Sequence, residues 1–252
     1  MKRGRRREDL QAQHTPDAIA MRLVTRKPSS DVGDAVLGAI DGCVTTFAVV
    51  SGVVGANLPQ RVALILGLAN LCADGFSMAV SNYQKAASEL QRSAQAREIE
   101  ARHIEEVPEG EREEIRQIFA QKGFTGQLLE DVVAVITQDR KRWVEMMLTE
   151  EHGLPLVGPV PLRAALVTFA GFFLAGLLPL APLMLPLAMS ASARFSISAW
   201  TTGATFLMIG VLKGHVLDRP RWRSGLETLL VGGGAAVLAY MIGAWLRDIA
   251  GT

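Results

Sequence analysis

The chain has few cysteines and a low share of charged residues, and both shortages exclude classes of protein. Only two cysteines, Cys43 and Cys72, occur among 252 residues, which is too few for the disulfide framework of a small secreted domain. Charged residues make up 20% of the chain and hydrophobic residues 49%, which argues against an ordinary soluble enzyme and against a disordered chain. The chain also lacks a glycine-rich phosphate loop, so we expect no nucleotide-driven pump. The formal net charge of +1 gives no reason to expect a nucleic-acid partner.

What the chain has is five apolar blocks that carry very little charge. They cover residues 32–57, 62–83, 162–189, 195–217 and 226–246. Each block holds at least twenty residues, and a helix of that length crosses the roughly 30 Å hydrocarbon core of a bilayer. The sequence therefore predicts an all-α, polytopic membrane protein with five transmembrane helices in a lipid bilayer.

The basic residues of the connecting segments predict the orientation of these helices. Segment 1–27 has eight Lys or Arg and three acidic residues, whereas loops 55–61 and 188–196 have one Arg each. The loop after the fourth block is basic again, with Lys213, Arg219, Arg221 and Arg223. Because Lys-rich and Arg-rich loops stay in the cytoplasm, we expect a cytoplasmic N-terminus and an external C-terminus. Short loops without eukaryotic sorting signals favour the plasma (inner) membrane of a bacterium.

We expect four parts along the chain. A basic cytoplasmic tail covers residues 1–30, and transmembrane helices 1 and 2 cover 31–84. A cytoplasmic helical domain that binds metal covers 85–155, and transmembrane helices 3 to 5 cover 156–252. The organisation therefore has one large cytoplasmic insertion, between the second and third transmembrane helices.

Helical spacing of apolar residues within this insertion predicts four helical segments. The second transmembrane helix is expected to continue past Tyr83 as far as Val107, where Pro108 and Gly110 interrupt it. Three shorter helices follow, over 111–121, 125–136 and 137–151, with Gly123 as the C-terminal cap of the first and Gly153 and Pro155 after the last.

The insertion begins with an unusually acidic stretch. Eight of the seventeen residues from Glu98 to Glu114 are glutamates, and only Arg102 and Arg112 are Lys or Arg. Crowded carboxylates repel one another unless a cation lies among them. A solvated helix face is the simplest interpretation of such a charge run, and it stays open.

The spacing of these residues favours a metal site instead. Residues three or four apart share one helix face, which pairs Glu100 with His103, Glu111 with Glu114, and Met147 with Glu151. Folding the helices together would collect carboxylate oxygens, an imidazole and a thioether. That mixed donor set suits iron(II), manganese(II) or zinc(II) better than calcium or magnesium. His14, His152 and His215 lie in or beside polar segments, and we interpret them as solvated.

Acidic residues inside the apolar blocks form a second candidate site. Asp41 lies deep in the first block and Asp74 deep in the second, where a carboxylate costs about 2.5–3.5 kcal/mol on insertion scales. Such residues usually face a polar path or a partner, so Asp41 and Asp74 are candidates for an ion pathway, with Thr45 and Met78 beside them. Hydrogen bonding between helices, and simple packing in the case of Met78, are the structural alternatives.

From about Ser30 to the C-terminus, the chain resembles the vacuolar iron transporter family. The resemblance rests on three stretches, which are Asp41–Gly42 with Thr45 and Phe47–Gly52, then Gly67–Asn70 with Asp74–Ala79 and Ser81–Tyr83, and finally the Glu-rich segment with Trp143–Glu145 and Gly153–Leu154. It implies a dimer of five-helix chains that exchanges iron(II), and often manganese(II), for protons. It also implies a cytoplasmic helical domain that gathers the metal, with no tightly bound cofactor.

Carried over position by position, the resemblance implies roles for individual residues. Asp41 and Met78 correspond to the membrane ligands, which line a path at the dimer interface. The cytoplasmic ligands correspond to Glu100, Glu111, Glu114, Met147 and Glu151. Two positions depart from the family pattern, because His103 replaces a glutamate and Leu148 replaces a methionine. An imidazole at position 103 should shift preference toward zinc or iron.

Two other functions remain as alternatives. Glu100-Ala101-Arg102-His103 is a literal Glu-x-x-His motif of the kind that di-iron bundles use, so a membrane-anchored di-metal oxidase or a metal sensor is one of them. Such sites normally have two copies of the motif, and this chain has one. The other alternative is a membrane-organising protein whose acidic domain binds no metal.

Overall fold

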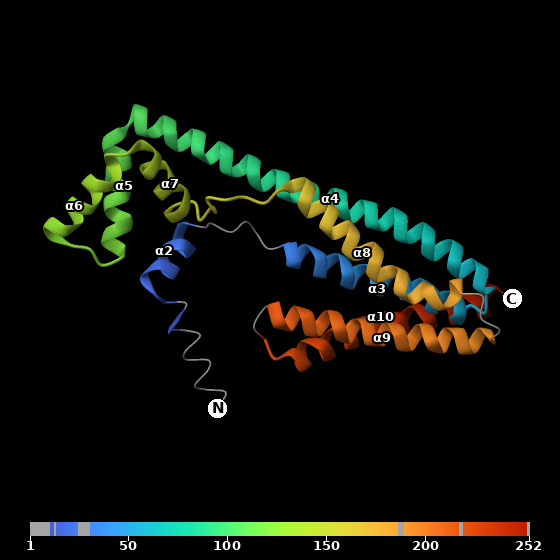
Figure 1. The fold of residues 1–252 in the computed structure, drawn as a ribbon. Coiled ribbons are helices and arrows are strands. Elements are labelled where there is room, and N and C mark those ends of the chain that lie inside the picture. Colours follow the sequence, from blue (N-terminus) through green and yellow to red (C-terminus); the bar gives the residue numbers. More distant parts are fainter. Residues whose placement is uncertain (1–10, 13, 25–30, 186–188, 217–218, 251–252) are drawn as a thin grey trace. The chain divides into compact units, whose positions relative to one another are not determined.

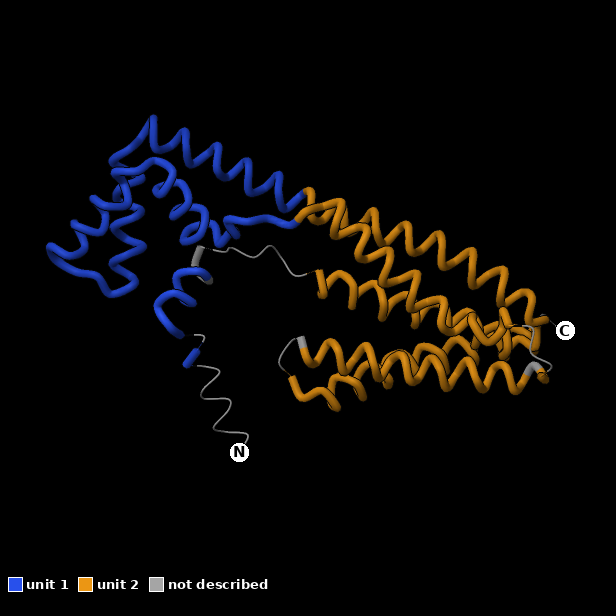
Figure 2. The backbone as a smooth tube through the Cα atoms, viewed as in Figure 1, with its two compact units in different colours: residues 1–29, 88–159 blue, residues 30–87, 160–252 orange. Residues whose placement is uncertain are grey.

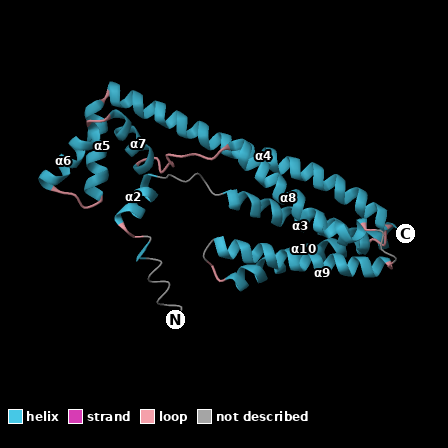
Figure 3. Ribbon diagram, in the orientation of Figure 1, coloured by secondary structure: helices cyan, strands magenta, loops and turns pink. Residues whose placement is uncertain are grey.

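The structure of the chain is a computed structural model, and it is all-helical (Figures 1 and 3). It describes residues 11, 12, 14–24, 31–185, 189–216 and 219–250, which contain no β-strand. The helices in chain order are α2 (Pro16–Val24), α3 (Asp31–Gly55), α4 (Gln60–Glu106), α5 (Pro108–Gln121), α6 (Gly126–Thr137), α7 (Arg140–Glu150), α8 (Pro161–Met184), α9 (Ala191–Val216) and α10 (Arg221–Ala250). The predicted all-α class is confirmed.

Five of these helices are long and apolar enough to cross a membrane. They are α3, the first part of α4, α8, α9 and α10. Large apolar side chains on these helices are exposed, including Phe76, Leu174 and Trp200 at 66%, 66% and 81%. Contact of such side chains with lipid tails carries no penalty, whereas their exposure to water is unfavourable. The chain is therefore a multi-pass membrane protein, and the predicted number of spans is confirmed.

The chain divides into two compact units, which Figure 2 shows in different colours. The membrane unit comprises residues 30–87 and 160–252, and the helical domain comprises residues 1–29 and 88–159. Helix α4 contributes to both units because it continues without a break for 47 residues. Its end at Glu106 confirms the predicted extension beyond Tyr83.

Helix α3 lies at the centre of the membrane unit because its small residues let other helices approach closely. A Cβ atom added to Gly38 or Gly42 would overlap a backbone oxygen of α8, that of Thr168 or Phe172. A Cβ atom on Gly55 would overlap the carbonyl oxygen of Tyr240 in α10. Close backbone approach of this kind is how helices associate in membranes, where burial from water gives no driving force between them.

Helix α4 is held to α8 by apolar and polar contacts. Gly67 faces the side chain of Leu180, and Gly75 faces the ring of Phe172. Nearer the helical domain, the buried Asn82 side chain donates from Nδ2 to Thr168 Oγ1 at 2.7 Å and to Ala164 O at 3.3 Å. These hydrogen bonds satisfy the polar atoms that the two helices bury against each other.

The helical domain is built from the second part of α4 and the helices α5, α6 and α7. Its main core is a buried cluster of Ile115, Val133, Ile136, Trp143 and Met147. Gly123 follows α5 with a φ of +94°, a left-handed conformation that glycine adopts at helix ends without steric cost. The predicted cap at Gly123 is confirmed.

Two helices in this domain begin three residues away from their predicted starts. Helix α5 begins at Pro108 instead of residue 111, because proline fits the first turn of a helix, where its missing N–H leaves no hydrogen bond unmade. Helix α7 begins at Arg140 instead of residue 137, because Asp139 forms the N-cap, accepting from the amide of Arg142 at 2.8 Å. The segment predicted as a basic tail also contains a helix, α2.

Candidate metal-binding site

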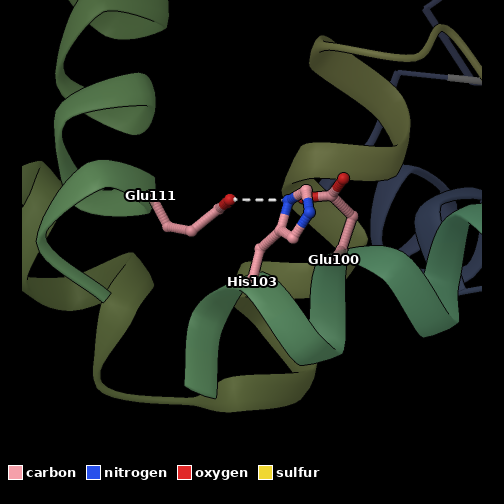
Figure 4. A group of neighbouring side chains, drawn as sticks. All are labelled: Glu100, His103 and Glu111. Atoms are coloured by element: carbon pink, nitrogen blue, oxygen red, sulfur yellow. Dashed lines mark ion pairs between the residues drawn. The ribbon is translucent and has the colours of Figure 1, made fainter. Parts of the chain in front are cut away.

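The end of α4 and the start of α5 bring two carboxylates and an imidazole together. Glu100 and His103 lie one turn apart on α4, and Glu111 projects toward them from the first turn of α5 (Figure 4). One ligand atom from each residue lies within 4.8 Å of the other two. His103 Nδ1 is 3.2 Å from Glu111 Oε1. Pro108 makes this possible because it allows α5 to begin directly after α4 ends.

The C-terminal end of α7 adds a second group around the same glutamate. Glu100, Glu151 and His152 also offer ligand atoms within 4.8 Å of one another. His152 Nε2 lies 2.8 Å from Glu100 Oε1 and 3.8 Å from Glu151 Oε2. Glu100 is therefore common to both groups, one completed by His103 and Glu111, the other by Glu151 and His152.

A glycine turn positions the second group. Gly153 has a φ of +63°, and the amide of Leu154 donates to Leu148 O at 2.8 Å, so the chain reverses direction immediately after α7. The amide of His152 donates to Met147 O at 3.2 Å, which holds His152 against the last turn of the helix. A side chain at position 153 would strain this left-handed turn.

Two glutamates of the site, Glu100 and Glu111, are buried without enough partners. Glu100 is 2% exposed and Glu111 is 3% exposed, and Oε2 of each has no hydrogen-bond partner. Nearby arginines bind other glutamates instead: Arg140 pairs with Glu105, and Arg116 pairs with Glu113 and Glu130. In the described part of the chain, Glu100 and Glu111 form ion pairs only with histidines. A buried, unpaired carboxylate is costly, so this pocket of negative charge favours a bound cation.

The same crowding changes the proton affinity of these acids. The pKa of Glu111 is raised from an ordinary 4.5 to about 7, first by burial and then by the neighbouring charges of Glu100, Glu114 and Glu151, against the opposing effect of His103. Burial, and then Glu100, also raises the pKa of Glu151. A divalent cation would remove this repulsion, so protons and metal ions compete for the site.

Two other predicted ligands, Glu114 and Met147, do not belong to either group of converging side chains. Glu114 is exposed and acts on Glu111 and Glu151 through its charge, although it belongs to neither group of converging ligand atoms. Met147 is completely buried and packs in the core with Ile115 and Trp143. Leu148 is also buried, in a neighbouring apolar cluster with Val144. Ligand roles for Glu114 and Met147 remain predictions.

The candidate membrane residues lie on α3 and α4. Asp41 and Thr45 are half-buried on α3, and Asp74 and Met78 are half-buried on α4. Thr45 Oγ1 donates to the backbone oxygen of Asp41 at 2.8 Å, which is a common bond for threonine within a helix.

His152 is the functional candidate that the sequence analysis missed. It was interpreted as solvated, and the residue is exposed, but its side chain is 32% exposed and its ring contacts the buried Glu100. The signal in the sequence was weak, because Glu100 and His152 are separated by 52 positions. The adjacent Glu151 and the turn residue Gly153 were the available indications that His152 would face the acidic helices.

Five apolar helices and a domain with converging carboxylates and imidazoles define a multi-pass membrane protein with a candidate cation site. Residues 32–244 match the sequence profile of the VIT family, and the chain belongs to this family. It is 33% identical over 236 residues to the vacuolar iron transporter of Toxoplasma gondii, which covers 90% of this chain and 78% of that protein. It is 32% identical over 213 residues to vacuolar iron transporter 1 of Arabidopsis thaliana, with 84% of each chain covered.

Proposed function

We propose that this chain transports iron(II) across a membrane, with the helical domain collecting the ion before transport. Membership of the VIT family, whose relatives are named as iron transporters, supports transport of a metal ion. The single observation that carries the domain's role is the pair of buried carboxylates, Glu100 and Glu111, each with an oxygen that lacks a partner. Manganese(II) and zinc(II) are further candidate substrates, because the donor atoms accept all three ions.

The proposed path through the membrane uses acids on α3 and α4. Asp41 and Met78 bind the ion in transit, while Asp74 and Thr45 line the same path. Acidic residues within membrane-spanning segments usually face a polar path or a partner, which supports this assignment. We further propose that two copies of the chain form the path as a homodimer.

We propose that metal leaves the cytoplasm in exchange for protons. A carboxylate must lose its proton to bind a metal ion, so one acid can carry either species but not both together. This competition couples the two movements when the acid meets each side of the membrane in turn. The distribution of Lys and Arg between loops supports a cytoplasmic helical domain and an external C-terminus. Short loops without eukaryotic sorting signals support a bacterial plasma membrane.

Transport by the purified protein in liposomes tests this proposal. Iron(II), manganese(II) and zinc(II) fluxes are followed together with internal pH, for the wild type and for Asp41→Ala. We expect metal movement with proton movement in the opposite direction, and we expect Asp41→Ala to abolish both while binding by the helical domain persists. Asp248→Ala, which removes an exposed acid near the end of α10, is the matched control and should transport normally.

Undiminished transport by Asp41→Ala at normal protein levels would contradict the proposed path. Absence of flux in the wild type, together with oxygen consumption when iron(II) is added, would instead favour the di-metal oxidase. Absence of flux without metal binding would favour a membrane-organising protein.

A further inference from the structure

We propose that His152 is a metal ligand, and that it gives the helical domain a second imidazole in addition to His103. The inference rests on the proposed function, in which this domain collects the transported ion, and it identifies what sets the domain's preference among metals. One imidazole then serves each of the two groups that share Glu100. His152 was not among the ligands that the resemblance implies.

The position of His152 supports this role. Its Nε2 atom lies 2.8 Å from Glu100 Oε1 and 3.8 Å from Glu151 Oε2, so one nitrogen faces a carboxylate of α4 and that of the adjacent residue. The hydrogen bond from its amide to Met147 O and the left-handed turn at Gly153 fix the backbone on both sides. A ligand held by the backbone loses little freedom when it binds an ion.

The surroundings of Glu100 distinguish a ligand site from a simple ion pair. An ion pair with His152 accounts for Oε1 of Glu100, but Oε2 has no partner although the residue is only 2% exposed. The side chain of His152 is one-third exposed, which leaves an approach for ions from solvent. A cation among Glu100, Glu151 and His152 would use the unpaired oxygen and relieve the repulsion between the two acids.

Two imidazoles have a chemical consequence for selectivity. Nitrogen donors suit zinc and iron, whereas manganese(II) prefers oxygen donors and binds most weakly in the divalent series. A site made only of glutamates would show smaller differences in affinity among these three ions. With His103 and His152 together, the helical domain should favour zinc(II) and iron(II) over manganese(II).

Metal titration of the full-length protein in detergent tests the role of His152. Zinc(II) and manganese(II) chlorides are titrated against the wild type and His152→Gln, because glutamine can still donate a hydrogen bond to Glu100 but is a poor zinc ligand. We expect zinc(II) affinity to fall by about tenfold or more, since even residues that only orient a ligand are worth that much. Manganese(II) affinity should change less, so the ratio of the two affinities falls.

A matched control and a spectroscopic signal separate binding from folding. His215→Gln changes a histidine of the membrane unit that contacts Arg221, and should leave the affinity ratio unchanged. Zinc K-edge X-ray absorption of the loaded protein should lose imidazole scattering in His152→Gln, while His103 retains the remainder. Circular dichroism of each variant checks that the helices persist.

An unchanged affinity ratio and unchanged imidazole scattering in a folded His152→Gln protein would overturn the inference, and His152 would then be only a hydrogen-bond partner of Glu100. That result leaves proton-coupled transport in liposomes unaffected, so it does not contradict the proposed function. Loss of the imidazole signal in a protein that transports no metal would support the ligand role and contradict the transporter.

Discussion

The acidic stretch on α4 and α5 contains two kinds of glutamate that the sequence alone does not separate. Glu105 and Glu113 are surface residues with arginine partners, and such pairs contribute little to stability. Glu100 and Glu111 are buried, and each leaves one oxygen unpaired. The composition predicted an excess of negative charge. Only the packing of α5 and α7 against α4 decides which carboxylates are buried without a partner.

The raised pKa of Glu111 predicts an unusual dependence of stability on pH in the metal-free protein. The folded state binds a proton at Glu111 up to about pH 7, while the unfolded state loses it near 4.5. Folding is therefore favoured at lower pH, and this stability is lost as pH rises through about 7. Glu151, whose pKa is also raised, acts in the same direction.

Hydrogen exchange of α5 amides measures this effect in metal-free protein. We expect protection to decrease between about pH 5 and pH 7.5 after correction for intrinsic exchange. Glu111→Gln should remove much of the decrease. Glu109→Gln, which changes an exposed residue of the same helix, should retain it. Equal pH dependence in the two variants would show that Glu111 is not its source.

At the scale of the helix, local chemistry predicted most of the domain and part of its candidate site. The spacing of apolar residues placed α5, α6 and α7 to within a few residues, because each helix buries one face in the domain core. The pair of Glu100 and His103 was also predictable, since three residues separate them on α4. The place of His152 in the second group was not, because a turn at Gly153 brings it to Glu100 across 52 positions.

The N-cap of α7 provides a test at this scale, because this helix leads to Glu151 and His152. Asp139 accepts a hydrogen bond from the Arg142 amide at 2.8 Å. Asp139→Ala should destabilise the helix by about 1 kcal/mol, whereas Asp139→Asn should cost little because asparagine is an equally good cap. Faster hydrogen exchange in the first turn of α7, in the alanine variant alone, is the expected result. Equal exchange in both variants would contradict it.

For the whole molecule, hydropathy predicted five membrane helices but not which of them is central. The apolar blocks have similar composition, and each forms a helix that is long and apolar enough to cross a bilayer. The decisive contacts are backbone contacts at Gly38, Gly42 and Gly55 of α3, where α8 and α10 approach. Glycine positions in a sequence do not identify their partners, so the arrangement of helices required the structure.

Gly42 should be one of the least replaceable residues of the membrane unit. A Cβ atom at Gly42 would overlap Phe172 O on α8, whereas a Cβ atom at Gly233 of α10 meets nothing within 4 Å. Gly42→Val should therefore destabilise the unit by about 1–3 kcal/mol or more, the usual cost of overpacking. Gly233→Val is the matched control. Thermal unfolding in detergent should show a lower midpoint for the first variant, and equal midpoints would contradict the packing.

The contacts of α3 also limit how this protein can vary over generations. Every missense change in a glycine codon adds atoms to the residue, since no amino acid is smaller. At Gly38 and Gly42 the added atoms would overlap backbone atoms of α8. A substitution in α8 changes only a side chain, so it cannot make room for them. A carboxylate ligand can be exchanged for another donor, such as an imidazole. The glycines of α3 have no such substitute. Mutation is therefore restricted more tightly at these packing positions than at the residues that could bind metal.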